Sequence, residues 1–176
     1  MTPSNTEQPP VKKSRKSSAP ATVESVANAT IENGPAQHAA PAPLFIAAID
    51  VRWRDLDAFN HVNNSIYLTY LEEARLQWLK HVPGPWFDEH SMPVLAASEI
   101  NYRRPIEWPA HLRVELYCTR LGNSSMTVVH RIVDADDAQR LYSDGHVVMV
   151  WMNPTTGTPV PLPQAIRDAA ASQNHS

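Results

Sequence analysis

The stretch that decides the fold runs from Val51 to Leu79 and reads VRWRDLDAFNHVNNSIYLTYLEEARLQWL. Two carboxylates, Asp55 and Asp57, stand just ahead of a polar turn at residues 60–64, and a run of aromatic and aliphatic residues at helical spacing follows. The first backbone amides of a helix have no intrahelical acceptor, so they can hold a developing negative charge. A carboxylate beside a helix start makes this stretch the candidate chemical centre of the chain.

Length and composition narrow the classes of protein. The 176 residues suit one domain with a substantial core, and the net charge of -3 favours neither a nucleic acid nor an anionic membrane as partner. Cys118 is the lone cysteine, which excludes an internal disulfide and suits a reducing compartment. No apolar run approaches the roughly 20 residues of a membrane helix, and no secretory signal is present. We expect a soluble, cytoplasmic protein.

The chain divides by composition near residue 43. Every Trp, Tyr and Phe lies at or beyond Phe45, whereas residues 1–43 are rich in Pro, Ala and Ser. Such a segment buries too little apolar surface to offset the entropy of ordering, so residues 1–43 are predicted to be a disordered leader and residues 44–176 a folded domain. The basic cluster at residues 12–16 is interpreted as a solvated patch, with a targeting or nucleic-acid role as the alternative.

The periodicity of the folded part predicts one long helix and several strands. A helix is expected from about His61 to His81, because apolar residues recur at three- and four-residue spacing. Strands are expected at residues 44–53, 94–102, 112–121, 126–133 and 146–152, and a short C-terminal helix at 163–171. Turn residues at 122–123 and 134–139 predict an antiparallel meander.

These elements favour an α+β fold in which a curved antiparallel sheet wraps around one long central helix. In the last strand, Val147, Met149 and Trp151 are apolar on one face, and Val148, Val150 and Met152 are apolar on the other. A strand that is apolar on both faces favours burial on both, so we expect a homo-oligomer.

Two roles are open to the acidic pair on spacing alone. Asp57 could act as a general base on water or attack a carbonyl directly, with amides around Asn63 and Asn64 as the oxyanion site. Alternatively, Asp55 or Asp57 only caps the helix or complements its dipole. A calcium loop is excluded because Phe59 and Asn60 occupy positions that require a ligand and a glycine. A metal site on His61 lacks a second histidine at helical spacing.

Residues 54–64, reading RDLDAFNHVNN, with Tyr67, Tyr70, Glu72, Glu73 and Arg75 after them, closely resemble the signature of hotdog-fold acyl-CoA thioesterases. The branch it is most similar to contains 4-hydroxybenzoyl-CoA thioesterase. A weaker resemblance extends through residues 101–105 and the strands to about Met152. The resemblance favours catalysis over capping for Asp57.

The resemblance implies a thioester hydrolase with active sites at the interface of a homodimer or homotetramer. It implies that Asp57 is the nucleophile or general base and that the Asn64 amide is the oxyanion donor, with His61 as a further catalytic candidate. Candidate substrate-binding residues are Asn63, Tyr67, Arg103, Arg104 and Arg120. No metal and no cofactor are expected, because coenzyme A is part of the substrate.

One departure from the family pattern leaves alternatives open. Asn60 stands where the family usually has glycine. If that position needs a left-handed backbone, Asn is the next most tolerant residue; if it needs room for the substrate, the side chain would crowd the thioester. The alternatives to an acyl-CoA thioesterase are therefore a non-catalytic acyl- or CoA-binding module and a thioesterase acting on acyl carrier protein.

Overall fold

The computed structural model describes residues 42–172. Their elements are β1 (Phe45–Asp50), a 3-10 turn (Trp53–Asp55), α1 (Asn64–His81), β2 (Met92–Tyr102), β3 (His111–Leu121), β4 (Ser125–Asp134), β5 (Leu141–Met152) and α2 (Gln164–Ala171). The leader predicted for residues 1–43 lies almost wholly outside the described residues, so it stays a prediction.

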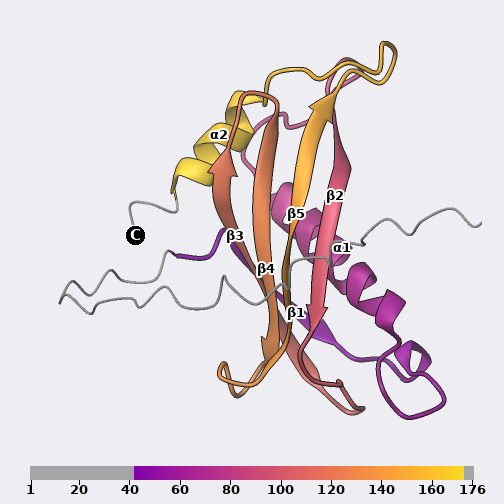
Figure 1. The fold of residues 1–176 in the computed structure, drawn as a ribbon. Helices are drawn as coiled ribbons and strands as arrows, with labels where there is room; N and C mark the ends of the chain where they lie inside the picture. Colours follow the sequence, from indigo (N-terminus) through magenta and orange to yellow (C-terminus); the bar gives the residue numbers. More distant parts are fainter. Residues whose placement is uncertain (1–41, 173–176) are drawn as a thin grey trace, which may run out of the picture. The chain divides into compact units, whose positions relative to one another are not determined.

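The strands form one antiparallel sheet in the order β1-β3-β4-β5-β2 (Figure 1). The α+β class is confirmed, and β3, β4 and β5 form the predicted meander. The meander is wrong for β2, which pairs with β5 at the far edge rather than with β3. The reason lies in the connection of residues 103–110, which contains Pro105 and Pro109 and offers no tight hairpin turn.

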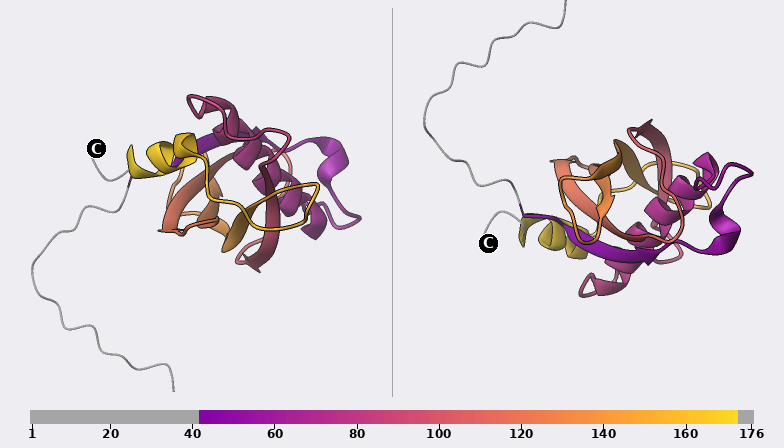
Figure 2. Two further views of the ribbon diagram at one scale, coloured as in Figure 1. Left: turned by 90° about the horizontal axis from the view of Figure 1, so that it is seen from above. Right: turned by 90° about the horizontal axis from the view of Figure 1, so that it is seen from below.

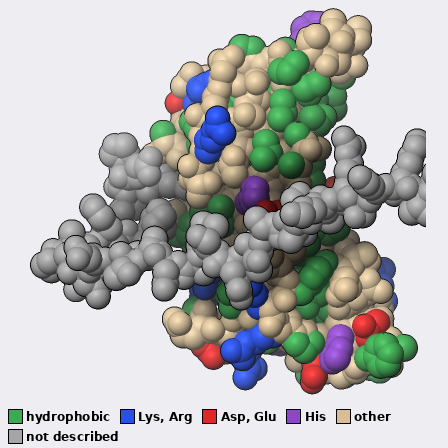
Figure 3. Space-filling view, in the orientation of Figure 1, with side chains coloured by type: hydrophobic (Ala, Val, Ile, Leu, Met, Phe, Trp, Pro, Cys, Tyr) green, Lys and Arg blue, Asp and Glu red, His purple; other side chains and the backbone are tan. Residues whose placement is uncertain are grey.

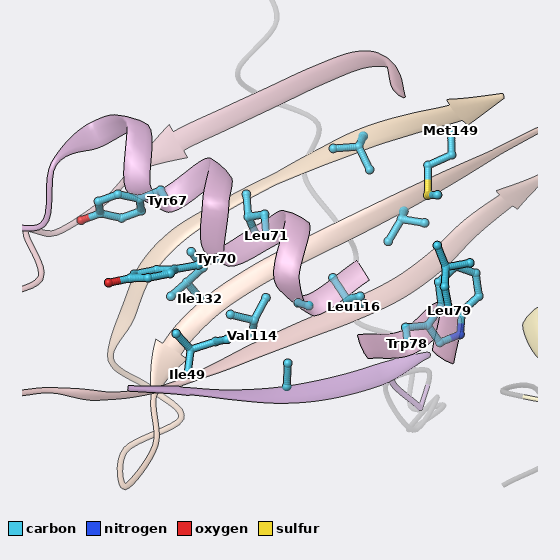
Figure 4. Packing of buried hydrophobic residues seen from close by; sticks show 14 of the residues in the cluster. Ile49, Tyr67, Tyr70, Leu71, Trp78, Leu79, Val114, Leu116, Ile132 and Met149 are labelled. Atoms are coloured by element: carbon cyan, nitrogen blue, oxygen red, sulfur yellow. The ribbon is translucent and has the colours of Figure 1, made fainter. Parts of the chain in front are cut away.

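Helix α1, of 18 residues, crosses diagonally behind the strands in Figure 1. The end-on views in Figure 2 show the strands as a curved layer with α1 against its inner side. The apolar face of α1 is buried against that layer (Figure 4), and it consists of Tyr67, Tyr70, Leu71, Ala74, Trp78 and Leu79. Burying each large apolar side chain contributes about 1.5–3 kcal/mol, so this face holds the helix on the sheet.

Three boundaries differ from the sequence prediction by three residues or more. Helix α1 begins at Asn64 rather than His61, because the Asn63 side chain caps it by accepting a hydrogen bond from the Ser65 amide. Strand β1 ends at Asp50, and Trp53 lies in the following turn with 72% of its surface exposed. Strand β5 starts at Leu141 instead of His146, because its polar first residues pair with neighbours on both sides.

Candidate active site

The Asp57 carboxylate is held by its own turn through one oxygen only. Its Oδ1 accepts hydrogen bonds from the amides of Phe59 (2.8 Å) and His61 (3.1 Å). The Asp57 amide in turn donates to the His61 carbonyl at 2.7 Å. Within residues 42–172, Oδ2 has no hydrogen-bond partner. The turn thus fixes the direction of the carboxylate and leaves one oxygen available to a reactant.

The same two amides set the charge of Asp57. The amide of Phe59, followed by that of His61, holds the pKa of the Asp57 carboxyl below its usual range. Hydrogen bonds to the charged form of an acid favour that form. Asp57 is therefore an ionised carboxylate at neutral pH.

Asn60 supplies the backbone conformation that closes this turn. Its φ is 61°, in the left-handed region that glycine adopts most readily and asparagine next. The Asn60 side chain is exposed and lies outside the cavity at the helix start that is described below. The φ of Asn60 fits a left-handed turn at this position, and Asn60 also lines, together with Asp57, a separate cavity of about 290 Å³.

Asp55 has a different environment. It is 1% exposed, and its carboxylate accepts hydrogen bonds from the Arg52 amide (2.9 Å) and the Tyr70 hydroxyl (2.7 Å). Burial alone would raise the pKa of Asp55, but hydrogen bonds from Arg52 and Tyr70 outweigh it and leave that pKa lowered. Asp55 thus closes the 3-10 turn and ties it to α1 through Tyr70, whereas the cap of α1 itself is Asn63.

The start of α1 leaves one backbone amide free. Asn63 accepts from the Ser65 amide through its side chain (3.0 Å) and from the Ile66 amide through its carbonyl (2.8 Å). Within residues 42–172, the Asn64 amide has no acceptor. The predicted oxyanion donor is therefore the unoccupied N–H of this helix start.

A cavity of about 260 Å³ lies between these groups. The residues that line it are Asp57, His61, Val62, Asn64, Tyr67, Tyr102, Arg103, Arg104 and Pro105. The Tyr102 hydroxyl donates to the Asn64 carbonyl at 3.1 Å, and the rings of Tyr67 and Tyr102 meet edge to face at 5.0 Å. These contacts join the end of β2 to the start of α1, so the sheet forms one wall and the helix the other.

The structure brings together most of the predicted site residues. Asp57, His61, Asn64, Tyr67, Arg103 and Arg104 share the cavity. Asn63 does not line it and acts as the helix cap. Arg120 lies near the opposite end of β3 from His111, on the order of 30 Å along the strand from the end that is closest to the cavity.

The charged side chains around the cavity have distinct states. Arg103 is paired with Asp144 through two hydrogen bonds of 2.7 and 2.9 Å. The Arg104 side chain makes no hydrogen bond or ion pair within residues 42–172 and also lines a neighbouring cavity of about 670 Å³. Glu72 and Glu73 are exposed on α1 and do not line the cavity at the helix start.

Tyr102 and Pro105 were not predicted as site residues. The available signal was their place in residues 101–105, directly after a predicted strand. Their contribution depends on β2 lying beside the start of α1, which local periodicity does not reveal.

The chain is similar to proteins of one family. Residues 51–170 match the model of the thioesterase-like superfamily. The long-chain acyl-CoA thioesterase FadM of Escherichia coli is 27% identical over 122 residues, which cover 68% of this chain and 92% of FadM.

Solved structures show the same similarity. The PA2801 protein of Pseudomonas aeruginosa is 39% identical, with a TM-score of 0.65 over 72% of this chain and 98% of that one. A thioesterase of Thermus thermophilus, solved with coenzyme A and Zn, is 32% identical, with a TM-score of 0.64 over 77% of this chain and 97% of that one.

Proposed function

The chain belongs to the thioesterase-like superfamily, and on that premise we propose that it hydrolyses an acyl-CoA thioester to the free acid and coenzyme A. Membership confirms the family resemblance drawn from residues 54–75 and the predicted enzyme class, a thioester hydrolase. Coenzyme A as the carrier is supported by the name of FadM and by the coenzyme A bound to the Thermus thermophilus structure. The hydrolysis needs no metal or other cofactor in this proposal.

One observation carries the proposal: a carboxylate with a free oxygen and a backbone amide with no acceptor line the same cavity. In the proposed reaction, Asp57 attacks the thioester carbonyl or takes a proton from an attacking water. The carbonyl oxygen becomes an oxyanion and accepts from the Asn64 amide, the C–S bond breaks, and the thiolate leaves and takes up a proton. In the general-base version the attacking water gives the free acid directly. In the nucleophile version the acyl group stays on Asp57 as a mixed anhydride, which a water molecule then hydrolyses to the free acid and the carboxylate. The lowered pKa of Asp57 keeps it ionised, which both versions require.

His61 contributes mainly through its backbone in this scheme. Its amide and carbonyl hold Asp57 in place, while its side chain lines the cavity and lies 3.8 Å from the Glu107 carboxylate. Tyr67 and Tyr102 form an aromatic wall for the acyl or pantetheine part. Arg103 and Arg104 lie at the rim, where Arg104 has a guanidinium free for a phosphate.

The active form is proposed to be a homodimer or homotetramer with sites at the subunit interface. Support comes from β2, an edge strand whose apolar residues Met92, Val94 and Leu95 are each more than 40% exposed. Figure 3 shows apolar side chains gathered over the upper part of β5 and β2. An unpaired apolar edge favours covering by another chain. For the fold, we propose the hotdog arrangement, in which the sheet wraps around one long central helix.

No helix within residues 42–172 is long and apolar enough to cross a membrane. Cytoplasmic location stays a prediction.

The proposal is tested with purified full-length protein and a panel of acyl-CoAs of increasing chain length. Release of the coenzyme A thiol is followed with a thiol reagent, and coenzyme A binding is measured by calorimetry. We expect saturable thiol release for at least one chain length. Saturable binding without thiol release across the panel would contradict hydrolysis and favour the binding-module alternative.

A further inference from the structure

Two buried polar side chains beneath α1 have no partner. Ser143 on β5 is fully buried and His130 on β4 is 1% exposed. Neither the Ser143 hydroxyl nor either ring nitrogen of His130 has a hydrogen-bond partner within residues 42–172. Leaving a buried donor or acceptor unsatisfied costs about 1–3 kcal/mol, so each such group requires an explanation.

The register of the sheet places both groups next to the catalytic cavity. Ser143 pairs with Tyr102, whose hydroxyl contacts the start of α1. One row further along the same face, Ile100 pairs with Gly145, which in turn pairs with His130. Because alternate residues of a strand share a face, Ser143 and His130 form a polar track that begins at Tyr102.

Gly145 makes room for the track. A Cβ at this position would clash first with the backbone carbonyl of Glu99 on β2, and it would also lie 2.9 Å from His130 Nε2, closer than side chains tolerate. The imidazole therefore lies over the glycine and across β5. His130 Nε2 therefore reaches from β4 to β5, the strand that lies next to β2.

Arg75 on α1 is a cation near this track. Arg75 follows Asn64 by about three turns of α1, so the two lie on one helix face, about 16 Å apart along the axis, with Leu68 and Leu71 between them. Arg75 is half-buried, and its guanidinium makes no hydrogen bond or ion pair within residues 42–172. Burial lowers the pKa of Arg75. Burial, followed by the charge of Arg75, lowers the pKa of His130.

The chemistry of these three groups is complementary to an anion. A guanidinium, a hydroxyl and an imidazole N–H are all donors, and among the described residues none of them makes a hydrogen bond or ion pair with a carboxylate. The charges of Glu72 and Asp144 act on Arg75 and His130 without such a contact. A half-buried cation gains most from a charge-assisted hydrogen bond with a carboxylate. Tyr102, the strand partner of Ser143, lines the cavity at the helix start, and Leu68 and Leu71 lie on the helix face between that cavity and Arg75. This order suits an acyl chain that is apolar near the thioester and ionised beyond it.

We infer that Arg75, His130 and Ser143 form a specificity site for an acyl group that carries a carboxylate, so that the preferred substrates are CoA thioesters of dicarboxylic acids. This inference rests on the proposed thioesterase function. Water molecules filling the track are the competing explanation for the unpaired groups.

The test compares acyl-CoAs that differ only at the far end of the chain. Wild-type protein is assayed with hexanoyl-CoA, hexanedioyl-CoA and ω-hydroxyhexanoyl-CoA, and with the corresponding decanoyl series. Arg75→Met removes the charge and retains the side-chain stem, and Arg75→Gln is measured beside it so that either variant that folds gives an answer. Lys80→Met, an exposed cation on the same helix, is the matched control.

We expect a kcat/KM for one dicarboxylic thioester about tenfold to a hundredfold above that of the plain acyl thioester, as the loss of a charged hydrogen bond implies. The Arg75 variants lose this ratio and keep their activity on plain acyl-CoA, whereas Lys80→Met keeps the ratio.

A wild-type ratio near one, a ratio that survives in the Arg75 variants, or a preference for the hydroxyl over the carboxylate overturns the inference. Hydrolysis of plain acyl-CoA in those cases leaves the thioesterase proposal intact. Absence of hydrolysis with every substrate removes that proposal as well.

Discussion

Asp55 and Asp57 are two residues apart and belong to the same motif, yet the protein surrounds them differently. Asp55 is buried, accepts hydrogen bonds from Arg52 and Tyr70, and joins a turn to the helix. Asp57 is half-buried and gives one oxygen to backbone amides, while the other oxygen has no partner within residues 42–172. If Asp57 reacts as proposed, the contrast teaches that a structural acid differs from a reactive one by the number of lone pairs that the fold leaves open.

Substitutions of the two acids should therefore alter different measured quantities. Substitutions of Asp55 should lower the free energy of unfolding, because its carboxylate accepts the hydrogen bonds of the donors around it. Changes at Asp57 or at the Asn64 amide should lower the rate of catalysis. The unpaired oxygen and the unpaired N–H contribute only when a reactant is bound.

Removing the Asn64 amide gives the largest of the effects predicted for the surroundings of the two acids. Asn64→Pro deletes this N–H at the first helical position, where proline is well tolerated. The preceding residue, Asn63, has ψ 137°, which is compatible with a following proline. We expect kcat to fall by about a hundred- to a thousand-fold, the usual cost of one oxyanion donor.

Asn64→Ala retains the amide and serves as the control for Asn64→Pro, so its kcat should stay within a few fold of wild type. Equal kcat losses in both variants would assign the effect to the side chain, and no loss in the proline variant would exclude the amide as oxyanion donor.

Mild acid should separate stability from the charge of Asp57. Burial, followed by the nearby Arg75 charge, lowers the pKa of His130 from 6.5 to about 4. The unfolded chain therefore takes up the proton first, and the free energy of unfolding should fall as pH drops from 6.5 to 4, by about 3 kcal/mol in all.

In the upper part of this pH range Asp57 stays ionised, because its pKa lies below its usual value. Urea unfolding at several pH values measures the loss of stability, and initial rates per folded molecule measure activity. His130→Gln should flatten the stability profile, whereas the exposed His90→Gln should leave its slope unchanged. A wild-type stability that is constant from pH 6.5 to 4 would show that His130 is not held neutral.

Asp55→Asn is expected to lower the free energy of unfolding by about 2 kcal/mol, because an amide replaces a buried carboxylate that accepts charged and neutral hydrogen bonds. Tyr70→Phe should reproduce part of this loss by removing one of those bonds. Denaturant unfolding of both variants is the measurement. If Asp55→Asn retains full stability but loses its activity, the roles of the two acids have been assigned the wrong way round.

Asn60 gives the smallest effect. Asn60→Ala should cost about 1 kcal/mol, because alanine at a φ of 61° is strained, and Asn60→Gly should cost nothing or stabilise slightly. Thermal unfolding measures both. A changed acyl-chain preference in Asn60→Gly would instead support the crowding explanation for this position.

Local pattern in the sequence predicted the elements better than their pairing. The buried face of α1 was predicted because its residues recur at helical spacing. The start of β5 was missed because residues 143–145 are polar or glycine and are held as a strand by partners on both sides. The pairing of β2 with β5 is non-local, so no nearby turn indicates it.

The site was predictable to the same extent. The motif placed Asp57, His61 and Asn64 together, since they lie in one turn and one helix start. The spacing of the motif did not show which of Asp55 and Asp57 has the structural role, because that depends on which of them the fold buries. Tyr102 reaches the cavity only through sheet topology, and Arg120 lies too far along β3 to line it.

The most direct test of the account is the rate of thiol release by Asp57→Asn beside wild type, with the folded fraction of both checked by unfolding. The account predicts that kcat falls by about a hundred- to ten-thousand-fold, while the unfolding midpoint and the affinity for coenzyme A remain close to those of wild type. A folded Asp57→Asn protein that releases thiol at the wild-type rate would contradict it.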